Sequence, residues 1–115
     1  MGFNNICDCP NPPGGQAVCE PNQLAICRVK NGVAQMQCLN PPVISAPVGS
    51  PGWQLAMQNW VLSAVTGEHR EPGRSLGPAE LQLLIDGHRE TRREIVTFSL
   101  PDDLRAAMST RFVTA

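Results

Sequence analysis

Two short runs of β-forming residues flank an Asn-Gly pair in the first half of the chain. The runs cover residues 24–30 and 33–39, and Asn31-Gly32 lies between them. Asn-Gly is typical of a type I′ turn, because that turn requires a positive φ at both central residues. The pattern therefore predicts a β-hairpin whose register is fixed by the turn, with residue 27 facing residue 36.

The alternation of side chains divides this hairpin into two faces. One face is uncharged and holds Cys27 and Cys38, whereas the other carries Arg28 and Lys30. We expect the uncharged face to be the buried one. Its two cysteines are diagonal neighbours about 7–8 Å apart, which is somewhat far for a disulfide between them. That spacing suits two ligands of one ion, or bonds to two different partners.

A proline-rich stretch separates the hairpin from the clearest helical pattern in the chain. Eight of the eleven prolines fall between positions 10 and 51, so residues 41–52 are expected to form an extended connector. Ser50-Pro51 is typical of a helix start and Gly67 of a helix end. Apolar residues recur between them at helical spacing and place Trp53 and Trp60 on one stripe. The pattern predicts a helix at about 51–66.

Shorter elements are predicted in the rest of the chain. They are a helix at about 78–86 that Gly87 ends, a strand at about 94–99, and a helix at about 101–109 with two acidic residues in its first turn. The predicted fold class is α+β. A small Cys-rich hairpin module with an irregular N-terminal arm occupies 1–40, the connector 41–52, and a small helical segment with one strand 53–115.

Composition and charge restrict the functions that fit the chain. A chain of 115 residues buries one modest core, and its eleven prolines and ten glycines favour a core completed by a cross-link, a metal or a partner. The net charge of −1 gives no field that attracts nucleic acid or anionic membrane. The absence of a membrane-length apolar run or a signal-peptide pattern predicts a cytoplasmic protein. Disulfide-bonded cysteines would instead indicate an extracellular one.

The cysteines form the most distinctive constellation of the sequence: Cys7, Cys9, Cys19, Cys27 and Cys38. The pair Cys7-x-Cys9 resembles a tight metal-binding knuckle, and Cys27 and Cys38 can supply the second pair of thiolates. We expect these four to bind one structural zinc ion with no open coordination position, with Cys19 as an alternative ligand. The spacing contains no C-x2-C and matches no standard template. Disulfides and free thiols are the alternatives.

No arrangement of residues predicts catalysis. The serines lack a nucleophile elbow, and Gly14-Gly15 lacks the lysine and the helix of a phosphate-binding loop. His69 and His88 are expected in solvated polar loops. The sequence therefore predicts no catalytic residue and a protein that is not an enzyme.

Residues 92–104 read Arg-Arg-Glu-Ile-Val-Thr-Phe-Ser-Leu-Pro-Asp-Asp-Leu. This segment resembles the opening of a ribbon-helix-helix repressor, in which a basic-flanked strand precedes a helix with an acidic start. In that family two such strands pair across a dimer and alternate side chains read the major groove of DNA. The resemblance implies a DNA-binding accessory protein with a partial strand and helix at 92–108, in which Ile95 and Thr97 would face the bases.

The function that fits these observations best is a non-catalytic interaction, adaptor or assembly subunit. Its N-terminal module would be cross-linked, by zinc in the leading interpretation, and its partner would be a larger protein or further copies of itself. Trp53 and Trp60 are candidate anchors for that partner, with a place in the core as the alternative. A DNA-binding accessory protein and a disulfide-stabilised structural or secreted small protein are the competing interpretations.

Overall fold

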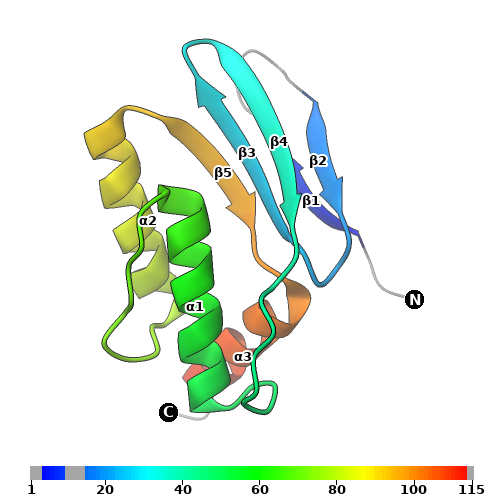
Figure 1. Cartoon of the computed structure of the whole chain (residues 1–115), viewed down its shortest axis with the longest axis vertical. Coiled ribbons are helices and arrows are strands. Elements are labelled where there is room, and N and C mark those ends of the chain that lie inside the picture. Colours follow the sequence, from blue (N-terminus) through cyan, green and yellow to red (C-terminus); the bar gives the residue numbers. More distant parts are fainter. Residues whose placement is uncertain (1–3, 10–14, 114–115) are drawn as a thin grey trace.

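The computed structural model describes residues 4–9 and 15–113, with side chains as far as Ser109. It confirms the α+β class (Figure 1). In chain order the elements are β1 (Asn5–Asp8), β2 (Gln16–Cys19), β3 (Leu24–Lys30), β4 (Val33–Leu39), α1 (Pro51–Thr66), α2 (Pro78–Arg92), β5 (Ile95–Ser99) and α3 (Asp102–Val113).

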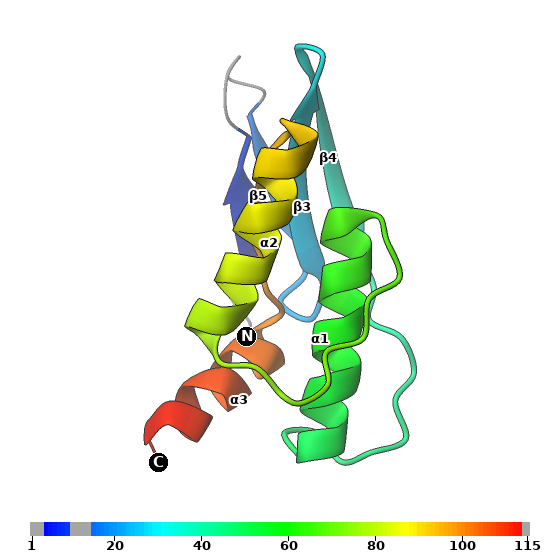
Figure 2. The same cartoon turned by 90° about the vertical axis from the view of Figure 1, so that its left-hand side faces the viewer.

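These elements form three layers. The central layer is a three-stranded antiparallel sheet in the order β4-β3-β5. The helices cover one of its faces, and the two-stranded antiparallel sheet β1-β2 lies against the other (Figures 1 and 2). Strand β5 comes from the far end of the chain, so the hairpin and the helical segment are joined through β3.

The predicted hairpin is confirmed with its predicted register. Cys27 faces Met36 and Lys30 faces Val33 across the turn. Asn31 and Gly32 have φ angles of 54° and 77°, which is the pair of positive values that a type I′ turn requires. The turn therefore sets which side chains of β3 and β4 share a face.

The prediction of a single buried face on this hairpin is wrong. Ala25 and Cys27 are indeed buried, but so are Leu24 and Ile26 on the opposite face. Met36, on the face predicted to be buried, is 47% exposed. The reason is that β3 lies in the middle layer and is covered on both sides, as its nearly continuous apolar run allows, whereas β4 lies at the edge of the sheet.

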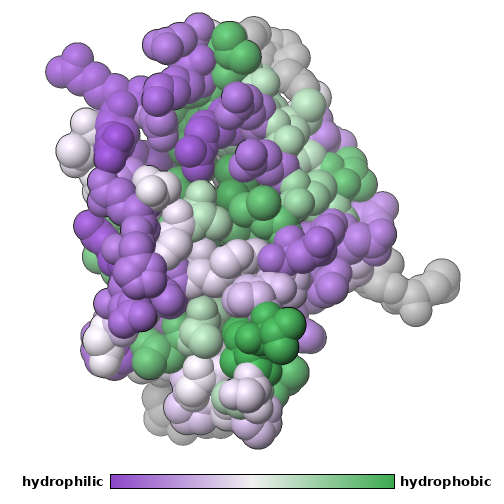
Figure 3. All heavy atoms as spheres, viewed as in Figure 1, coloured by the Kyte–Doolittle hydropathy of each residue, from purple (hydrophilic) through white to green (hydrophobic). Residues whose placement is uncertain are grey.

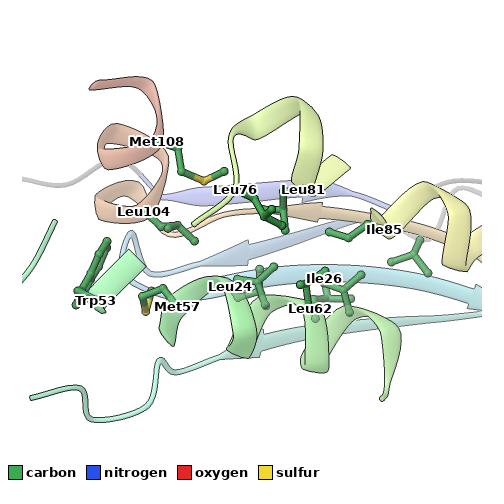
Figure 4. Close-up of a cluster of buried hydrophobic side chains, with 13 residues drawn as sticks. Leu24, Ile26, Trp53, Met57, Leu62, Leu76, Leu81, Ile85, Leu104 and Met108 are labelled. Atoms are coloured by element: carbon green, nitrogen blue, oxygen red, sulfur yellow. The ribbon is translucent and has the colours of Figure 1, made fainter. Parts of the chain in front are cut away.

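The main hydrophobic core lies between the central sheet and the helices (Figure 4). Large side chains from three helices, two strands and the segment before α2 meet there. Its buried members are Leu24, Ile26, Trp53, Met57, Val61, Leu62, Val65, Leu76, Leu81, Ile85, Val96, Leu104 and Met108. The hairpin thus contributes to the same core as the helices.

The helix α1 has the predicted bounds but buries more than its apolar stripe. Ser50 caps its first turn by accepting a hydrogen bond from the backbone N–H of Trp53, at 3.3 Å. Gln58, which its spacing places on the polar back of the helix, is fully buried. Its side-chain amide donates to the carbonyl of Leu76 and accepts from the N–H of Leu76, both at 2.7 Å. Gln58 therefore fixes the segment that leads into α2.

The helix α2 continues beyond the predicted stop at Gly87 and ends at Arg92. Its end is formed by Arg93, which has a φ of 54°, while the N–H of Glu94 donates to the carbonyl of Arg89. Asp86 and Arg89 form an ion pair at 3.1 Å on either side of Gly87. This pair bridges the glycine within the helix and favours its continuation by about 0.2–0.5 kcal/mol.

The irregular arm predicted before the hairpin is corrected to two strands, β1 and β2. They pair in register, with Ile6 opposite Val18 and Cys7 opposite Ala17. Each strand has only four residues, and a two-stranded hairpin of this size is marginal by itself in water. The stability of this small sheet therefore depends on its packing against the central sheet.

The two glycines at 32 and 87 give a paired test of this backbone. The Gly32→Ala variant places a Cβ at a positive φ, so its free energy of unfolding falls by about 1 kcal/mol. The Gly87→Ala variant replaces a helix-interior glycine whose added Cβ would contact nothing within 4 Å. Its free energy of unfolding rises by about 0.5–1 kcal/mol. Urea denaturation of the oxidised protein measures both, and shifts of the same sign would contradict the assigned turn and helix end.

Candidate functional site

A second buried cluster, made only of small side chains, lies between the two sheets. Its buried members are Cys7, Cys9, Ala17, Cys19, Ala25 and Cys27. The inward residues of β1 and β2 meet the inner face of β3 there. Four of the five cysteines of the chain therefore gather in one thin layer, and Cys38 at the rim brings the fifth.

Two disulfides connect the sheets across this layer. Cys9 bonds to Cys27 with a Cα–Cα distance of 4.9 Å, and Cys19 bonds to Cys38 with a Cα–Cα distance of 5.5 Å. One bond ties the end of β1 to β3, and the other ties β2 to β4. The two hairpin cysteines thus bond to different parts of the two-stranded sheet, since Cys9 directly follows β1 and Cys19 is the last residue of β2.

The predicted zinc site is corrected by this pairing. Three of the four predicted ligands form disulfides instead: Cys9, Cys27 and Cys38. The fourth, Cys7, is a free thiol that is bonded to none of them. Within residues 4–9 and 15–109, no group of three or more His, Cys, Asp or Glu side chains could hold a metal ion. Cys19, whose role the sequence left open, is the partner of Cys38.

Cys7 is the free cysteine of the structure. Its side chain is 5% exposed, and its Sγ lies 3.0 Å from the Oγ1 of Thr97 on β5. The Thr97 hydroxyl also donates to the carbonyl of Asp8, at 2.6 Å. The Cys7 thiol is thus packed between β1 and β5 and contributes to their contact.

A buried asparagine that the sequence analysis missed joins β1 to the rest of the chain. Asn5 is 2% exposed, and its side-chain amide donates to the carbonyls of Gln23, Ser99 and Leu100 at 2.6, 3.0 and 3.2 Å. Its Oδ1 accepts from the hydroxyl of Ser99 and from Arg105, the latter at 3.4 Å. Asn5 has no sequence signature, because its partners lie as far as 100 residues away.

The titratable residues with shifted pKa values belong to exposed ion pairs. A hydrogen bond from Arg92, at 2.6 Å, lowers the pKa of Glu68 and ties the loop after α1 to α2. Arg74 pairs with Glu80, and this hydrogen bond raises the pKa of the Arg74 guanidinium. Both pairs fasten loop to helix.

Hollows on the described surface are shallow. One, of about 490 Å³, is lined mainly by charged side chains of the α2–β5 junction, among them Asp86, Arg89 and Glu94. Another, of about 260 Å³, lies where the connector meets α1 and the start of α3, and Trp53 and Met57 are part of its lining. Figure 3 shows a hydrophilic surface over α2 and an apolar patch where the connector runs below the sheets.

The two tryptophans occupy different environments. Trp53 is 6% exposed and is a member of the main core. Trp60 is partly buried and packs against the same core. Their role as anchors for a partner stays a prediction, and most of the surface of Trp53 is already covered by its own chain.

Strand β5 and helix α3 match the segment that resembles a ribbon-helix-helix repressor. Strand β5 is paired along one edge with β3 of its own chain. Thr97, a position that would face DNA in that family, lies beneath β1 and bonds to it. DNA binding stays a prediction, and the structure adds no contact that favours it.

The outer edge of β4 is the most unusual surface feature of the central sheet. Within the part of the chain that the structure describes, no strand pairs with this edge, and Figure 2 shows β4 at the margin of the sheet. Its seven residues include no charged residue and no proline, and its pairing with β3 continues without a bulge. Val33 is 62% exposed and Met36 is 47% exposed. Natural proteins ordinarily protect such edges with charges, proline, bulges or a covering segment.

Comparisons with protein-family models, with curated proteins and with solved structures find no match to this chain.

The disulfide pairing predicts a definite pattern of thiol reactivity. The oxidised protein should weigh four hydrogens less than the fully reduced chain, with one alkylated residue, Cys7, after denaturation without reductant. Intact-mass measurement and peptide mapping check this. Replacing Cys19 and Cys38 together by alanine should lower the free energy of unfolding by about 3 kcal/mol, because their bond closes a loop of 19 residues. Recovery of five alkylated cysteines would contradict the pairing.

The Asn5 network gives a second prediction. The Asn5→Ala variant removes a buried donor shared by three backbone carbonyls, so its free energy of unfolding should fall by about 2 kcal/mol. Asn5→Asp keeps the acceptor but loses the donor, and it should also be destabilised. Asn4→Ala, at an exposed neighbouring position, is the matched control and should change stability by less than about 0.5 kcal/mol. Equal stability of Asn5→Ala and Asn4→Ala would show that the network contributes nothing.

Proposed function

We propose that this protein is a non-catalytic assembly subunit that binds other protein chains through the open edge of β4. The observation that carries the proposal is the regular and uncharged edge of β4, with which no other strand of the described residues pairs. An exposed strand edge presents a row of backbone donors and acceptors, and adding a strand there is a common mode of protein recognition.

The disulfides support this proposal in two ways. They tie β4 to β2 and β1 to β3, so the edge is held by a rigid scaffold, and a pre-ordered strand loses less entropy on binding. Disulfides also persist in oxidising environments, which is compatible with a protein that acts outside the reducing cytosol. Among the described residues no helix is long and apolar enough to cross a membrane.

The test compares native masses of the chain in material from the cells that make it. The wild-type chain should sediment in a complex heavier than its own 12.4 kDa. Met36→Lys places a charge on the edge and should shift the chain toward the mass of the monomer. Leu83→Lys adds the same charge at a position of α2 that is 72% exposed, and it should leave the complex intact. A wild-type chain that is monomeric in that material would overturn the proposal.

A further inference from the structure

We infer that the partner of the β4 edge is a second copy of this chain, paired antiparallel to the first about a two-fold axis at Met36. This inference rests on the proposed function, since it names the occupant of the same edge. The argument for it comes from the direction of the backbone groups, the sequence of β4 and the space around the edge.

The hairpin register determines which backbone groups point outward. In a hairpin closed by a two-residue turn, the residues that flank the turn, Lys30 and Val33, exchange both backbone hydrogen bonds. The odd-numbered residues of β4 therefore bond to β3. The even-numbered residues Ala34, Met36 and Cys38 direct their N–H and C=O groups away from the sheet. Consecutive outward residues are two positions apart, as an added antiparallel strand requires.

The sequence of β4 is nearly palindromic about its central residue. It reads Val-Ala-Gln-Met-Gln-Cys-Leu. A two-fold axis at Met36 places each Ala34 opposite Cys38 of the other copy, and each Gln35 opposite Gln37. In this register the outward backbone groups of both copies meet one another, because every outward residue faces another outward residue.

The side-chain pairs in this register match by chemistry. On the face toward the helices, Val33 lies opposite Leu39 of the other copy, and the two glutamines can hydrogen bond across the pair. On the face toward β2, the two Met36 side chains are direct neighbours and cover each other's apolar surface. An uncharged edge brings no like charges together. An unrelated strand would gain the same main-chain hydrogen bonds, but a second copy also matches every side-chain pair in this register, which is why the observations favour a second copy.

Among residues 4–9 and 15–113, the neighbouring layers leave this edge free. Strand β2 contacts both β3 and β4, so it covers β4 from the inner side, and Met36 remains 47% exposed beyond it. On the helix side Gln35 and Gln37 are exposed, so no helix lies over the edge there either. Two copies can therefore approach in the plane of the central sheet and form a continuous six-stranded sheet.

Sedimentation equilibrium of the purified, oxidised full-length chain tests the inference. The wild-type protein should reach twice the mass of the chain in a concentration-dependent manner. Met36→Lys and Met36→Glu should each weaken self-association by at least about tenfold, because like charges then meet at the two-fold axis. Leu83→Lys should associate like the wild type. Near-ultraviolet circular dichroism and intact mass establish that each variant keeps its fold and both disulfides.

An equimolar mixture of Met36→Lys and Met36→Glu provides the decisive measurement. The two charges are opposite in the mixed dimer, so association should be restored and native mass spectrometry should show the heterodimer in excess of either homodimer. A mixture that stays monomeric, or single variants that dimerise like the wild type, would overturn the register at Met36. A purified wild-type chain that is monomeric at every concentration would overturn self-pairing. If the same chain still sediments in a heavier complex in its source material, the proposed function stands with a different partner.

Discussion

The burial of β3 on both of its faces is the constraint on which the rest of the structure depends. Leu24 and Ile26 point into the helix core, and Ala25 and Cys27 point into the cysteine layer. The strand also pairs along both edges, with β4 and with β5. The two cores lie on opposite faces of this strand. A disruption of β3 would therefore uncouple all three layers at once.

The two cores are stabilised by different physical means. The helix side buries large aliphatic side chains, and the free energy gained from apolar burial grows with the area removed from water. The cluster between the sheets holds only cysteines and alanines, of which Ala34 is partly buried. It therefore gains little free energy from apolar burial. Its cross-links act mainly by restricting the unfolded chain. The short strands β1 and β2 therefore depend on the disulfides, and Asn5 supplies the polar contacts at their open end.

The parts of the fold with local signals could be predicted from the sequence. Asn31-Gly32 specifies the hairpin and its register, and the Ser50-Pro51 start with Gly67 as the end gives the bounds of α1. The strands β1 and β2 could not be predicted in this way, because four residues carry no readable periodicity. The end of α2 was missed because the left-handed residue that ends this helix is Arg93, a role that glycine usually takes, and Gly87 lies in the helix interior.

The cysteine pairing was predictable only in part, because it depends on how the two sheets pack against each other. The register of the hairpin placed Cys27 and Cys38 somewhat far apart for a disulfide between them, and bonds to two different partners were one of the two outcomes that this spacing suited. Choosing between them required knowledge that β1-β2 lies flat on the central sheet, where Cys9 and Cys19 each reach a hairpin cysteine. The zinc prediction was wrong because a zinc site needs four ligand atoms around one ion. Here the cysteines between the sheets form two separate bonded pairs instead.

Both edge strands of the central sheet lack charged residues, since β4 reads VAQMQCL and β5 reads IVTFS. At β5 the small sheet supplies polar contacts, because the Thr97 hydroxyl donates to the carbonyl of Asp8 and the Asn5 amide donates to the carbonyl of Ser99. At β4 a single lysine at an exposed position such as Gln35 or Gln37 would discourage pairing with other chains at little cost to the monomer. The Cys19–Cys38 bond moreover holds this strand in place. A rigid and unprotected edge is a liability in a protein that acts alone, whereas in an assembly subunit it is a binding surface that needs little further ordering.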